Sequence, residues 1–414
     1  LEPSRMEKAK KILSSLGFSN VVPPLERPLA EELYGKPLRT SVSRLERFQT
    51  CPFQHFARDG LGLKEREVFS LDPAKAGTFY HEAMKEFVVR IMSESVPIES
   101  LEDSDATRMM EKIVEEMVPK VQNELFLSSF RYRHVSRSLC STLTRSAHLF
   151  LQHAKRGDFR PIAVEVPFGL GGEIPPLSLN ISEDDQVLVR GLIDRIDAAR
   201  MGDDVFLRVV DYKSGRDKLD LTDVYYGLSL QLLVYLAAAL SLWEKIVNSR
   251  HLLGLCDGDG FEIRGFSNDV QPAGALYMPI RDPFIRTDGP RDRESALEQV
   301  RKELRMTGIV IDDLNVIRLM DKTTSLGQSD LVNVQFTKQG VSANSPVASY
   351  DQMRALLDYV MRKITAISEE IVSGRIDISP FLKNKVRGCK YCPFEPFCVF
   401  DVLLEGNEYR VLRN

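Results

Sequence analysis

Apolar residues recur at helical spacing in the first part of the chain and along strands in the middle. The stretch 72–92 places Phe79, Met84, Phe87 and Val88 on one face, which predicts a long helix with a buried stripe. Helical patterns also cover 4–18, 106–126 and 130–153, and a Pro-rich connector covers 21–37. A short helix capped by Ser41 or Ser43 should bury Leu45 and Phe48 and end at Cys51.

The middle of the chain changes to short runs rich in β-branched residues, which predict strands at 159–168, 186–200 and 204–214. One long helix is expected over 221–246. Beyond it the pattern weakens, with a strand over 274–280, helices over 293–306 and 312–320, a loop over 323–330 and a clear amphipathic helix over 350–374. This order of elements predicts an α/β fold with its chemistry at the strand ends.

Composition narrows the class of protein further. The 414 residues are 43% hydrophobic and 28% charged, as in an ordinary globular protein of more than one lobe. No run reaches the roughly 18 apolar residues of a membrane span, so we expect a cytoplasmic protein without membrane contact. The net charge of −4 offers no global basic field, so contact with DNA would need local patches. The chain begins at Leu1, which suggests part of a longer polypeptide.

An acid and a base stand one residue apart where the third predicted strand ends, in LRVVDYKSG. Asp211 and Lys213 should share one face of the strand, with Tyr212 on the other. For such a pair alone, a strand-end salt bridge is the commoner explanation. However, Asp194 lies in the preceding strand, and hairpin pairing would bring it to Asp211, where both carboxylates could bind one divalent cation. Alternation places Asp197 on the opposite face, as a strand-end or salt-bridging residue.

Two further groups could complete such a site. His81 lies on the long helix at 72–92 and could be a third metal ligand, although a lone histidine there is more often an ordinary surface residue. Gln231 and Tyr235 are four residues apart in an apolar helix, so they share a face and need polar partners. A DNA strand or the metal site would supply them.

Four cysteines are spaced as metal ligands rather than as disulfides. Cys389, Cys392 and Cys398 form a C-x2-C-x5-C run, and Cys51 could supply a fourth thiolate from far upstream. The spacing alone leaves zinc and an iron–sulfur cluster open, and Cys51 by itself would more often be a free thiol. Cys140 and Cys256 stand alone and fit simple core or surface positions.

In this order, Gly77-x3-His81, Gly191-x2-Asp194, Asp211-Tyr212-Lys213 and Gln231-x3-Tyr235 resemble the RecB-type nuclease branch of the PD-(D/E)xK superfamily. The resemblance implies a restriction-endonuclease-like central mixed sheet flanked by helices, with helical insertions. It also implies Mg²⁺ or Mn²⁺ held by His81, Asp194, Asp211 and the main-chain carbonyl of Tyr212. Lys213 would be catalytic, and Gln231 and Tyr235 would contact DNA and support the site.

The cysteine pattern is similar to the iron–sulfur staple of the AddB family, from about Leu38 to the end of the chain. That resemblance implies a [4Fe–4S] cluster on Cys51, Cys389, Cys392 and Cys398 joining the N- and C-terminal parts in one lobe, with a structural role. It further implies a heterodimer with an AddA-type helicase–nuclease subunit. The DNA substrate would be a single strand, the 5′-ended one, from an unwound duplex end during double-strand break processing for homologous recombination.

The same resemblance suggests five segments: a connector from a missing helicase-like region (1–37), the first part of the cluster lobe (38–72), the nuclease core with a helical insertion (73–245), a further insert region (246–345), and the last helix with the rest of the lobe (346–414). Basic residues near the cysteines could form a DNA-binding rim or a merely solvated face, namely Lys383, Lys385, Arg387 and Lys390 with Tyr391 and Phe394 among them.

Two alternatives remain open from the residues. One is a non-catalytic DNA-end scaffold that keeps the fold and the cluster, against which the intact Asp194, Asp211 and Lys213 count. The other is a stand-alone iron–sulfur exonuclease, whose gene would begin near Leu1 without a long upstream reading frame.

Overall fold

The computed structural model describes residues 3–16, 19–66, 73–93, 97–120, 130–215, 218–249, 270–285, 289, 292–323 and 326–413. The expectations for Cys256 and for the end of the helix at 106–126 lie outside these residues. The helices described are α1 (Pro3–Leu16), α2 (Arg27–Tyr34), α3 (Val42–Thr50), α4 (Pro52–His55), η1 (Phe56–Gly60), α5 (Pro73–Ser93), η2 (Ile98–Ser100), α6 (Asp103–Met117), η3 (Val118–Lys120), α7 (Phe130–Arg156), α8 (Leu221–Tyr226), α9 (Gln231–Ser241), α10 (Trp243–Val247), α11 (Arg293–Glu303), α12 (Leu314–Met320), α13 (Tyr350–Val372) and α14 (Glu395–Cys398).

The strands described are β1 (Leu38–Ser41), β2 (Arg160–Phe168), β3 (Leu177–Asn180), β4 (Gln186–Met201), β5 (Asp204–Lys213), β6 (Val270–Pro279), β7 (Thr307–Ile311), β8 (Gly327–Gln328), β9 (Gln335–Thr337), β10 (Gly340–Val341), β11 (Val347–Ala348), β12 (Phe381–Lys383), β13 (Val386–Arg387) and β14 (Arg410–Val411). The central sheet runs β1-β4-β5-β6-β7-β11, and β2 and β3 both pair with the long strand β4.

The central sheet is mixed, as the resemblance implied. The β4–β5 hairpin and the β6–β7 pair are antiparallel, whereas β5–β6 and β7–β11 are parallel. The β4–β5 register pairs Arg195 with Val210, so the next position along the ladder places Asp194 opposite Asp211. The hairpin therefore brings the two predicted carboxylates to the same end of the sheet.

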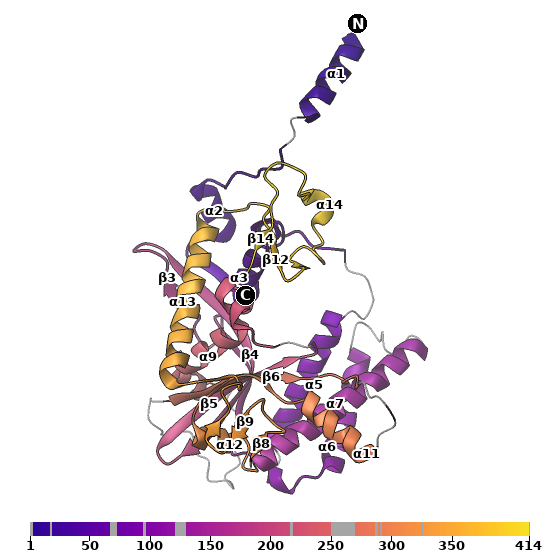
Figure 1. Ribbon diagram of the computed structural model, residues 1–414, viewed down its shortest axis with the longest axis vertical. Helices are drawn as coiled ribbons and strands as arrows, with labels where there is room; N and C mark the ends of the chain where they lie inside the picture. The colour runs from indigo at the N-terminus through magenta and orange to yellow at the C-terminus, as the bar shows by residue number, and fades with distance from the viewer. Residues whose placement is uncertain are drawn as a thin grey trace.

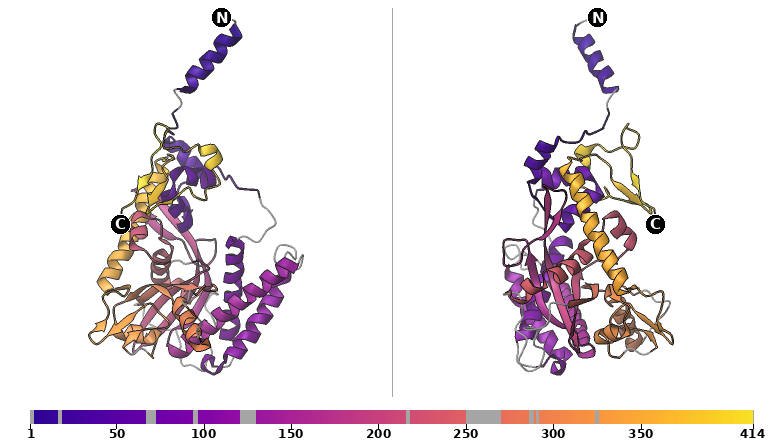
Figure 2. Two further views of the ribbon diagram at one scale, coloured as in Figure 1. Left: turned by 45° about the vertical axis from the view of Figure 1, so that its right-hand side comes forward. Right: turned by 90° about the vertical axis from the view of Figure 1, so that its left-hand side faces the viewer.

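Helices cover both faces of this sheet, and each face has its own hydrophobic core. One core gathers side chains of α3, α9, α10 and α13, and the other gathers those of α5, α6, α7 and α12. Strand β5 divides its residues between them, with Leu207 and Val209 in the first core and Val210 and Tyr212 in the second. Figures 1 and 2 show α13 along one side of the sheet and α5, α6 and α7 together on the other. Among the described helices, none is long and apolar enough to cross a membrane.

The single helix expected over 221–246 is wrong, because the chain breaks there into α8, α9 and α10. Gly227 ends α8 in the left-handed region, with φ of 77°. A Cβ at this glycine would lie 2.9 Å from Cγ of Gln49, so the close approach of α3 also requires a residue without a side chain. The break makes Gln231 the first residue of α9.

Several short strands were not predicted from the sequence, among them β1, β3, β7 and β11. The predicted strands at 159–168, 186–200 and 204–214 correspond to β2, β4 and β5, and the helix at 350–374 corresponds to α13. Long elements with a clear period were therefore found, whereas strands of two to five residues carry too few positions for a period to show.

A buried ion network fixes the β4–β5 hairpin from inside the second core. Asp197 accepts hydrogen bonds from Nη2 of Arg195 at 3.2 Å and from Nε of Arg208 at 2.8 Å, and all three side chains are at most 2% exposed. The salt-bridging role predicted for Asp197 is confirmed. Arg195 also donates to the hydroxyl of Tyr212 at 3.0 Å, which ties the network to the strand end that carries the carboxylates.

We predict that Asp197→Asn lowers the free energy of unfolding by roughly 3–5 kcal/mol, because it leaves two buried guanidinium groups without their counter-charge. Urea denaturation followed by circular dichroism measures this. Asp203→Asn, in the exposed turn of the same hairpin, is the matched control and should change stability by less than about 0.5 kcal/mol. Equal stability of the two variants would contradict a supporting role for the network.

Candidate active site

Three acidic residues lie on neighbouring strands at one end of the sheet. Glu165 belongs to β2, Asp194 to β4 and Asp211 to β5. In the β2–β4 ladder, Glu165 falls between the Val164–Arg195 and Val166–Ile193 pairs, so it stands across from Asp194. The strand order β2-β4-β5 thus places the three carboxyl groups in a row.

Asp211 is fully buried and forms an ion pair with Lys213, whose Nζ lies 2.7 Å from Oδ2. Apart from this pair, its carboxylate has no hydrogen-bond partner among the described residues. Burial raises the pKa of Asp211 to about 7; the charge of Asp194 adds to the effect and Lys213 opposes it. A buried carboxylate with free lone pairs is a group that a divalent cation would satisfy.

Asp194 connects the helix α5 to the strand end. Its Oδ2 accepts a hydrogen bond from the backbone N–H of Tyr212 at 2.8 Å and lies 3.2 Å from Nδ1 of His81. Burial alone would lower the pKa of His81, but the hydrogen bond to Asp194 and the nearby acidic charges outweigh it, so the pKa is raised. His81 and Asp194 are therefore in contact, and Asp211 lies near enough for its charge to act on the pKa of His81.

Glu165 is a site residue that was not predicted from the sequence. Its backbone has φ of 47°, the left-handed region that residues other than glycine seldom adopt, and it interrupts an otherwise apolar strand. Burial and the charge of Asp194 raise its pKa. The sequence indicated this residue only as a lone acid inside the apolar run PIAVEVPF. The strand order is needed to show that it faces Asp194.

Among the described residues, His81, Glu165 and Asp194 form the one group of His, Cys, Asp and Glu side chains whose ligand atoms all lie within 4.8 Å of one another. These three line a cavity of about 490 Å³, together with Gln231 and Tyr235 of α9. One imidazole and carboxylate oxygens are a donor set that suits Mg²⁺ or Mn²⁺. The predicted ligands Asp211 and the carbonyl of Tyr212 are adjacent and stay predictions.

The beginning of α9 holds the predicted catalytic lysine in place. Gln231 accepts from Nζ of Lys213 at 3.1 Å and donates to the hydroxyl of Tyr235 at 3.1 Å. The carboxylate of Glu46 accepts from the backbone N–H groups of Leu230 and Gln231 at 2.7 and 3.0 Å, which caps this helix from α3. Gln231 and Tyr235 therefore have polar partners within the site, and Glu46 is a support that the sequence did not indicate.

Gly191, in the predicted Gly-x2-Asp motif, has a steric role. A Cβ there would lie 2.7 Å from the ring of Phe168 and 3.0 Å from the ring of Tyr235. These two rings pack edge to face, with centroids 6.1 Å apart. Glycine thus lets Tyr235 approach β4 three residues before Asp194.

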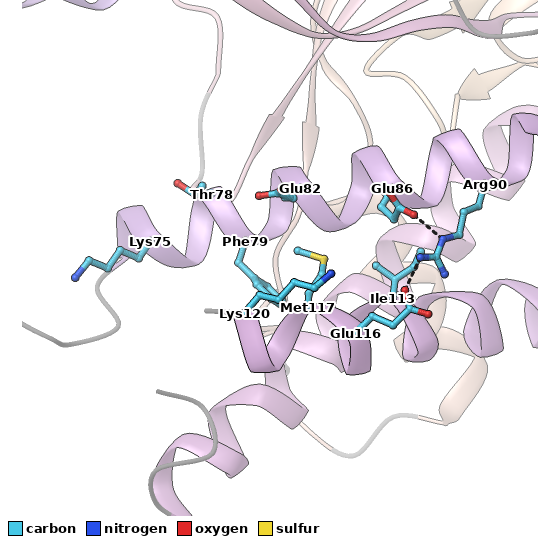
Figure 3. A pocket seen from close by; sticks show the side chains of 10 residues that line it. All are labelled: Lys75, Thr78, Phe79, Glu82, Glu86, Arg90, Ile113, Glu116, Met117 and Lys120. Carbon is cyan, nitrogen blue, oxygen red and sulfur yellow. Dashed lines mark hydrogen bonds and ion pairs between the residues drawn. The ribbon is translucent and has the colours of Figure 1, made fainter. Parts of the chain in front are cut away.

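A second cavity of about 460 Å³ lies on another side of α5 (Figure 3). Two of its three acidic side chains, Glu86 and Glu116, contact Arg90 at 2.7 Å each, and the third, Glu82, shares the cavity with Lys75 and Lys120. Because three cationic side chains line the cavity beside the three carboxylates, it does not offer a cation the uncompensated charge that Asp211 and its neighbours do.

The four predicted cluster ligands lie in two segments that pack together. Cys51 is buried between α3 and α4, and the other three thiols lie in the turn and short helix 389–398. Gly388 approaches the carbonyl of Thr50 so closely that a Cβ there would lie 3.0 Å from its oxygen. Arg410 also donates to the carbonyls of Gln49 and Thr50. Both segments sit at the same end of the molecule in Figures 1 and 2.

The cysteine sulfurs do not meet at the spacing of ligands to a single ion, among the residues described. Ligands of a polynuclear cluster stand farther apart, because each thiolate binds a different iron. Burial raises the pKa of Cys51 to about 11, while the backbone amides of Gln54, Ser379 and Phe53 face its sulfur and oppose that rise. Cys51 and Cys398 are buried, whereas Cys389 and Cys392 are half-buried.

The basic rim predicted around the cysteines is wrong for two of its members. Lys383 is mostly buried and forms ion pairs with Asp220 and Asp223 at 2.6 and 2.7 Å, and Phe394 is buried. Lys390 and Tyr391 are exposed and contact each other, with Nζ 5.0 Å from the ring centroid. Lys383 therefore joins the lobe to α8 rather than facing solvent.

Comparison with known proteins agrees with this geometry. Residues 39–399 match the PD-(D/E)XK nuclease superfamily. The chain is similar to a protein of Moorella thermoacetica named as a subunit of an ATP-dependent helicase/deoxyribonuclease, with 40% identity over 414 residues. Proteins of the same name from Desulforamulus reducens and Geobacillus kaustophilus are 39% and 36% identical over 412 and 409 residues. These alignments cover 98–100% of the chain but 33–34% of each relative, so the chain spans about a third of their length.

We predict that the affinity for Mn²⁺ falls as the pH falls below about 7, because the cation must displace the proton of Asp211. For each proton displaced, the affinity should fall about tenfold per pH unit. The folded state holds this proton more tightly than the unfolded chain does. The metal-free protein should therefore lose stability as the pH rises from about 4 to about 7.

Calorimetric titration and thermal unfolding, with Mn²⁺ or with a chelator, measure both effects. Asp211→Asn should reduce the pH dependence of stability and remove most of the stabilisation by Mn²⁺, whereas Asp203→Asn should keep both. An Mn²⁺ affinity that stays constant between about pH 5.5 and about pH 8.5 would show that Asp211 is not at the metal.

Proposed function

This chain belongs to the PD-(D/E)XK nuclease superfamily, and we propose that it is the metal-dependent nuclease part of a DNA helicase–nuclease subunit. The substrate would be a single DNA strand, cut by hydrolysis of its phosphodiester bonds. The observation that carries this proposal is the position of Lys213, whose ammonium contacts Asp211 and Gln231. These contacts lie beside the group formed by His81, Glu165 and Asp194.

The residues of the site divide the work of hydrolysis. His81, Glu165, Asp194 and Asp211 would hold Mg²⁺ or Mn²⁺, which when bound screens the phosphate and lowers the pKa of a water molecule. Lys213 is positioned to orient that water or to offset charge that develops on the phosphate. Its ammonium is held between two acceptors, so little reorganisation is needed when the substrate arrives.

Gln231 and Tyr235 line the same cavity as the metal-binding group. Burial raises the pKa of the Tyr235 hydroxyl, so it stays protonated and can donate a hydrogen bond to a phosphate or a sugar oxygen. Glu46 keeps the first turn of α9 in place beneath both side chains. These contacts support a role in DNA binding for the two residues.

The names of the relatives support a place in a larger assembly. They are subunits of ATP-dependent helicase/deoxyribonucleases, so we propose an AddA-type helicase–nuclease subunit as the partner. In that setting the strand reaching this site would come from a duplex end unwound at a double-strand break, before homologous recombination. Cleavage of the 5′-ended strand is part of this proposal.

Digestion of an end-labelled single strand in Mg²⁺ tests the catalytic role. We expect Asp211→Ala to lower the rate by roughly 10³-fold or more, because it removes a metal ligand, and Lys213→Met by about 10²–10³-fold. Lys245→Met, which changes an exposed lysine of α10, is the matched control and should cut like the wild type. Digestion by Asp211→Ala at the wild-type rate would leave a non-catalytic DNA-end scaffold as the better account.

We further propose that Cys51, Cys389, Cys392 and Cys398 hold a [4Fe–4S] cluster with a structural role. The support is the packing of Gly388 on Thr50 and of Arg410 on Gln49, which brings residues on either side of the thiols together. Linking positions so far apart in the chain would stabilise the fold by roughly 5 kcal/mol, as for a disulfide that closes a long loop.

Protein purified without oxygen should be brown, with broad visible absorption that Cys389→Ser removes while lowering the unfolding temperature. Cys140→Ser, which changes a cysteine of α7, should keep both the colour and the stability. A colourless preparation that contains one zinc ion per chain would replace the cluster with a zinc site.

A further inference from the structure

A third cavity, of about 340 Å³, lies next to the predicted catalytic lysine, and its lining includes five basic side chains and one acidic one, Glu303. Lys213 lines this cavity, whereas its hydrogen-bond partner Gln231 lines the metal-binding cavity. Lys213 therefore stands between the two. The other polar groups that matter here are Lys218, Arg281, Lys302, Arg305 and Asn333.

The charge of this basic cavity is only partly balanced. Lys302 pairs with Glu298, and Arg281 lies 3.4 Å from the carboxylate of Glu303. Lys218 is exposed, and no carboxylate lies within ion-pair distance of it in the described part of the chain. Arg305 donates to the main-chain carbonyls of Lys302 and Ser329, at 2.9 and 3.2 Å, so neither contact neutralises its charge.

Arg281 has one N–H donor without a hydrogen-bond partner among the described residues. Its Nη2 donates to the carbonyl of Glu303 at 3.0 Å, which caps the C-terminal end of α11. Its Nε is buried and has no hydrogen-bond partner among the residues that the structure describes. A buried donor left unsatisfied costs about 1–3 kcal/mol, so an anionic oxygen in the cavity would find a prepared site.

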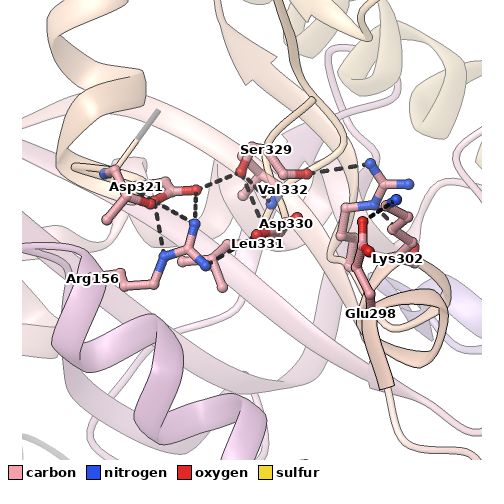
Figure 4. A network of polar contacts seen from close by, with 10 residues as sticks. Arg156, Glu298, Lys302, Asp321, Ser329, Asp330, Leu331 and Val332 are labelled. Atoms are coloured by element: carbon pink, nitrogen blue, oxygen red, sulfur yellow. Dashed lines mark hydrogen bonds and ion pairs between the residues drawn. The ribbon is translucent and has the colours of Figure 1, made fainter. Parts of the chain in front are cut away.

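The wall that carries Arg305 is held rigidly from behind. Ser329, whose carbonyl accepts from Arg305, donates through its hydroxyl to the fully buried Asp321 at 2.7 Å. Asp321 in turn accepts from Arg156 of α7 at 2.8 and 3.0 Å, as Figure 4 shows. This chain of contacts runs from the loop to the second core, so the position of Arg305 is set before any ligand arrives.

Capping of α11 alone does not account for the cavity. In capping this helix, Arg281 and Arg305 each donate to one main-chain carbonyl, whereas a guanidinium has five N–H donors. It also gives no role to Lys218, which lies on the loop after β5 and outside the capping contacts. Planar, forked donors that surround a small cavity are the usual means of binding a phosphate.

We propose that the basic cavity binds a backbone phosphate of the same DNA strand, adjacent to the phosphate that is cleaved. The inference rests on the proposed nuclease function, and it adds a subsite that would hold the strand in register across Lys213. Successive phosphates of one strand would then occupy the metal-binding cavity and the basic cavity, with the lysine between them.

The test measures binding of a fluorescent single-stranded oligonucleotide to the whole chain in a chelator, so that no cleavage occurs. We expect Lys218→Gln and Arg305→Gln each to raise the Kd several-fold and to make the plot of log K against log salt shallower, by about 0.7 for each phosphate that the variant no longer binds. Lys112→Gln, on the exposed face of α6, should bind like the wild type.

Lys218 is exposed, so its variant tests the subsite even if Arg305→Gln can no longer reach Ser329 and unfolds. A Kd and a salt slope for Lys218→Gln equal to those of the wild type would overturn the subsite. If both variants weaken binding as expected but the wild type does not cut the strand in Mg²⁺, the nuclease proposal fails and the phosphate site stands.

Discussion

The structure of this protein depends on keeping two like charges close together inside the sheet. Asp194 and Asp211 face each other across the β4–β5 ladder, one 6% exposed and the other fully buried. Burial and the charge of Asp194 together raise the pKa of Asp211. Lys213 supplies part of the counter-charge, and a cation would supply the rest. The site is therefore built at a cost in stability that binding of a cation would offset.

The strand register that creates this arrangement is stabilised by a nearby ion network in which two arginines surround one aspartate. Arg195, Asp197 and Arg208 form a closed network within the second core, and Tyr212 joins it through its hydroxyl. A slip of one residue in the hairpin would turn the arginines out of their core and Asp194 away from Asp211. The buried ion network thus contributes mainly to specifying where the strands pair, which is the best-attested use of such groups.

Lys213 lies between two cavities whose linings differ in charge. On one side lie carboxylates, an imidazole and the polar start of α9, and on the other lie guanidinium and ammonium groups. A cation and a polyanionic strand would have opposite requirements, and the groups suited to each lie on different sides of this lysine. The rigid supports differ as well: Glu46 of α3 fixes the first side, and Asp321 with Arg156 fixes the second.

The sequence by itself determined the long elements and the ordered motif, and it supplied a hypothesis for the chemistry of the site. Period and composition located α5, α13 and the β4–β5 hairpin, and the residues His81, Asp194, Asp211, Lys213, Gln231 and Tyr235 could be named because their spacing is local to one element each. Only the tertiary structure added Glu165, Glu46 and the basic cavity. Their roles arise from strand order and from contacts between segments far apart in the chain, which no local pattern records. At Gly227 both contribute: the left-handed φ of the glycine ends α8, and the close approach of α3 leaves no room for a side chain there.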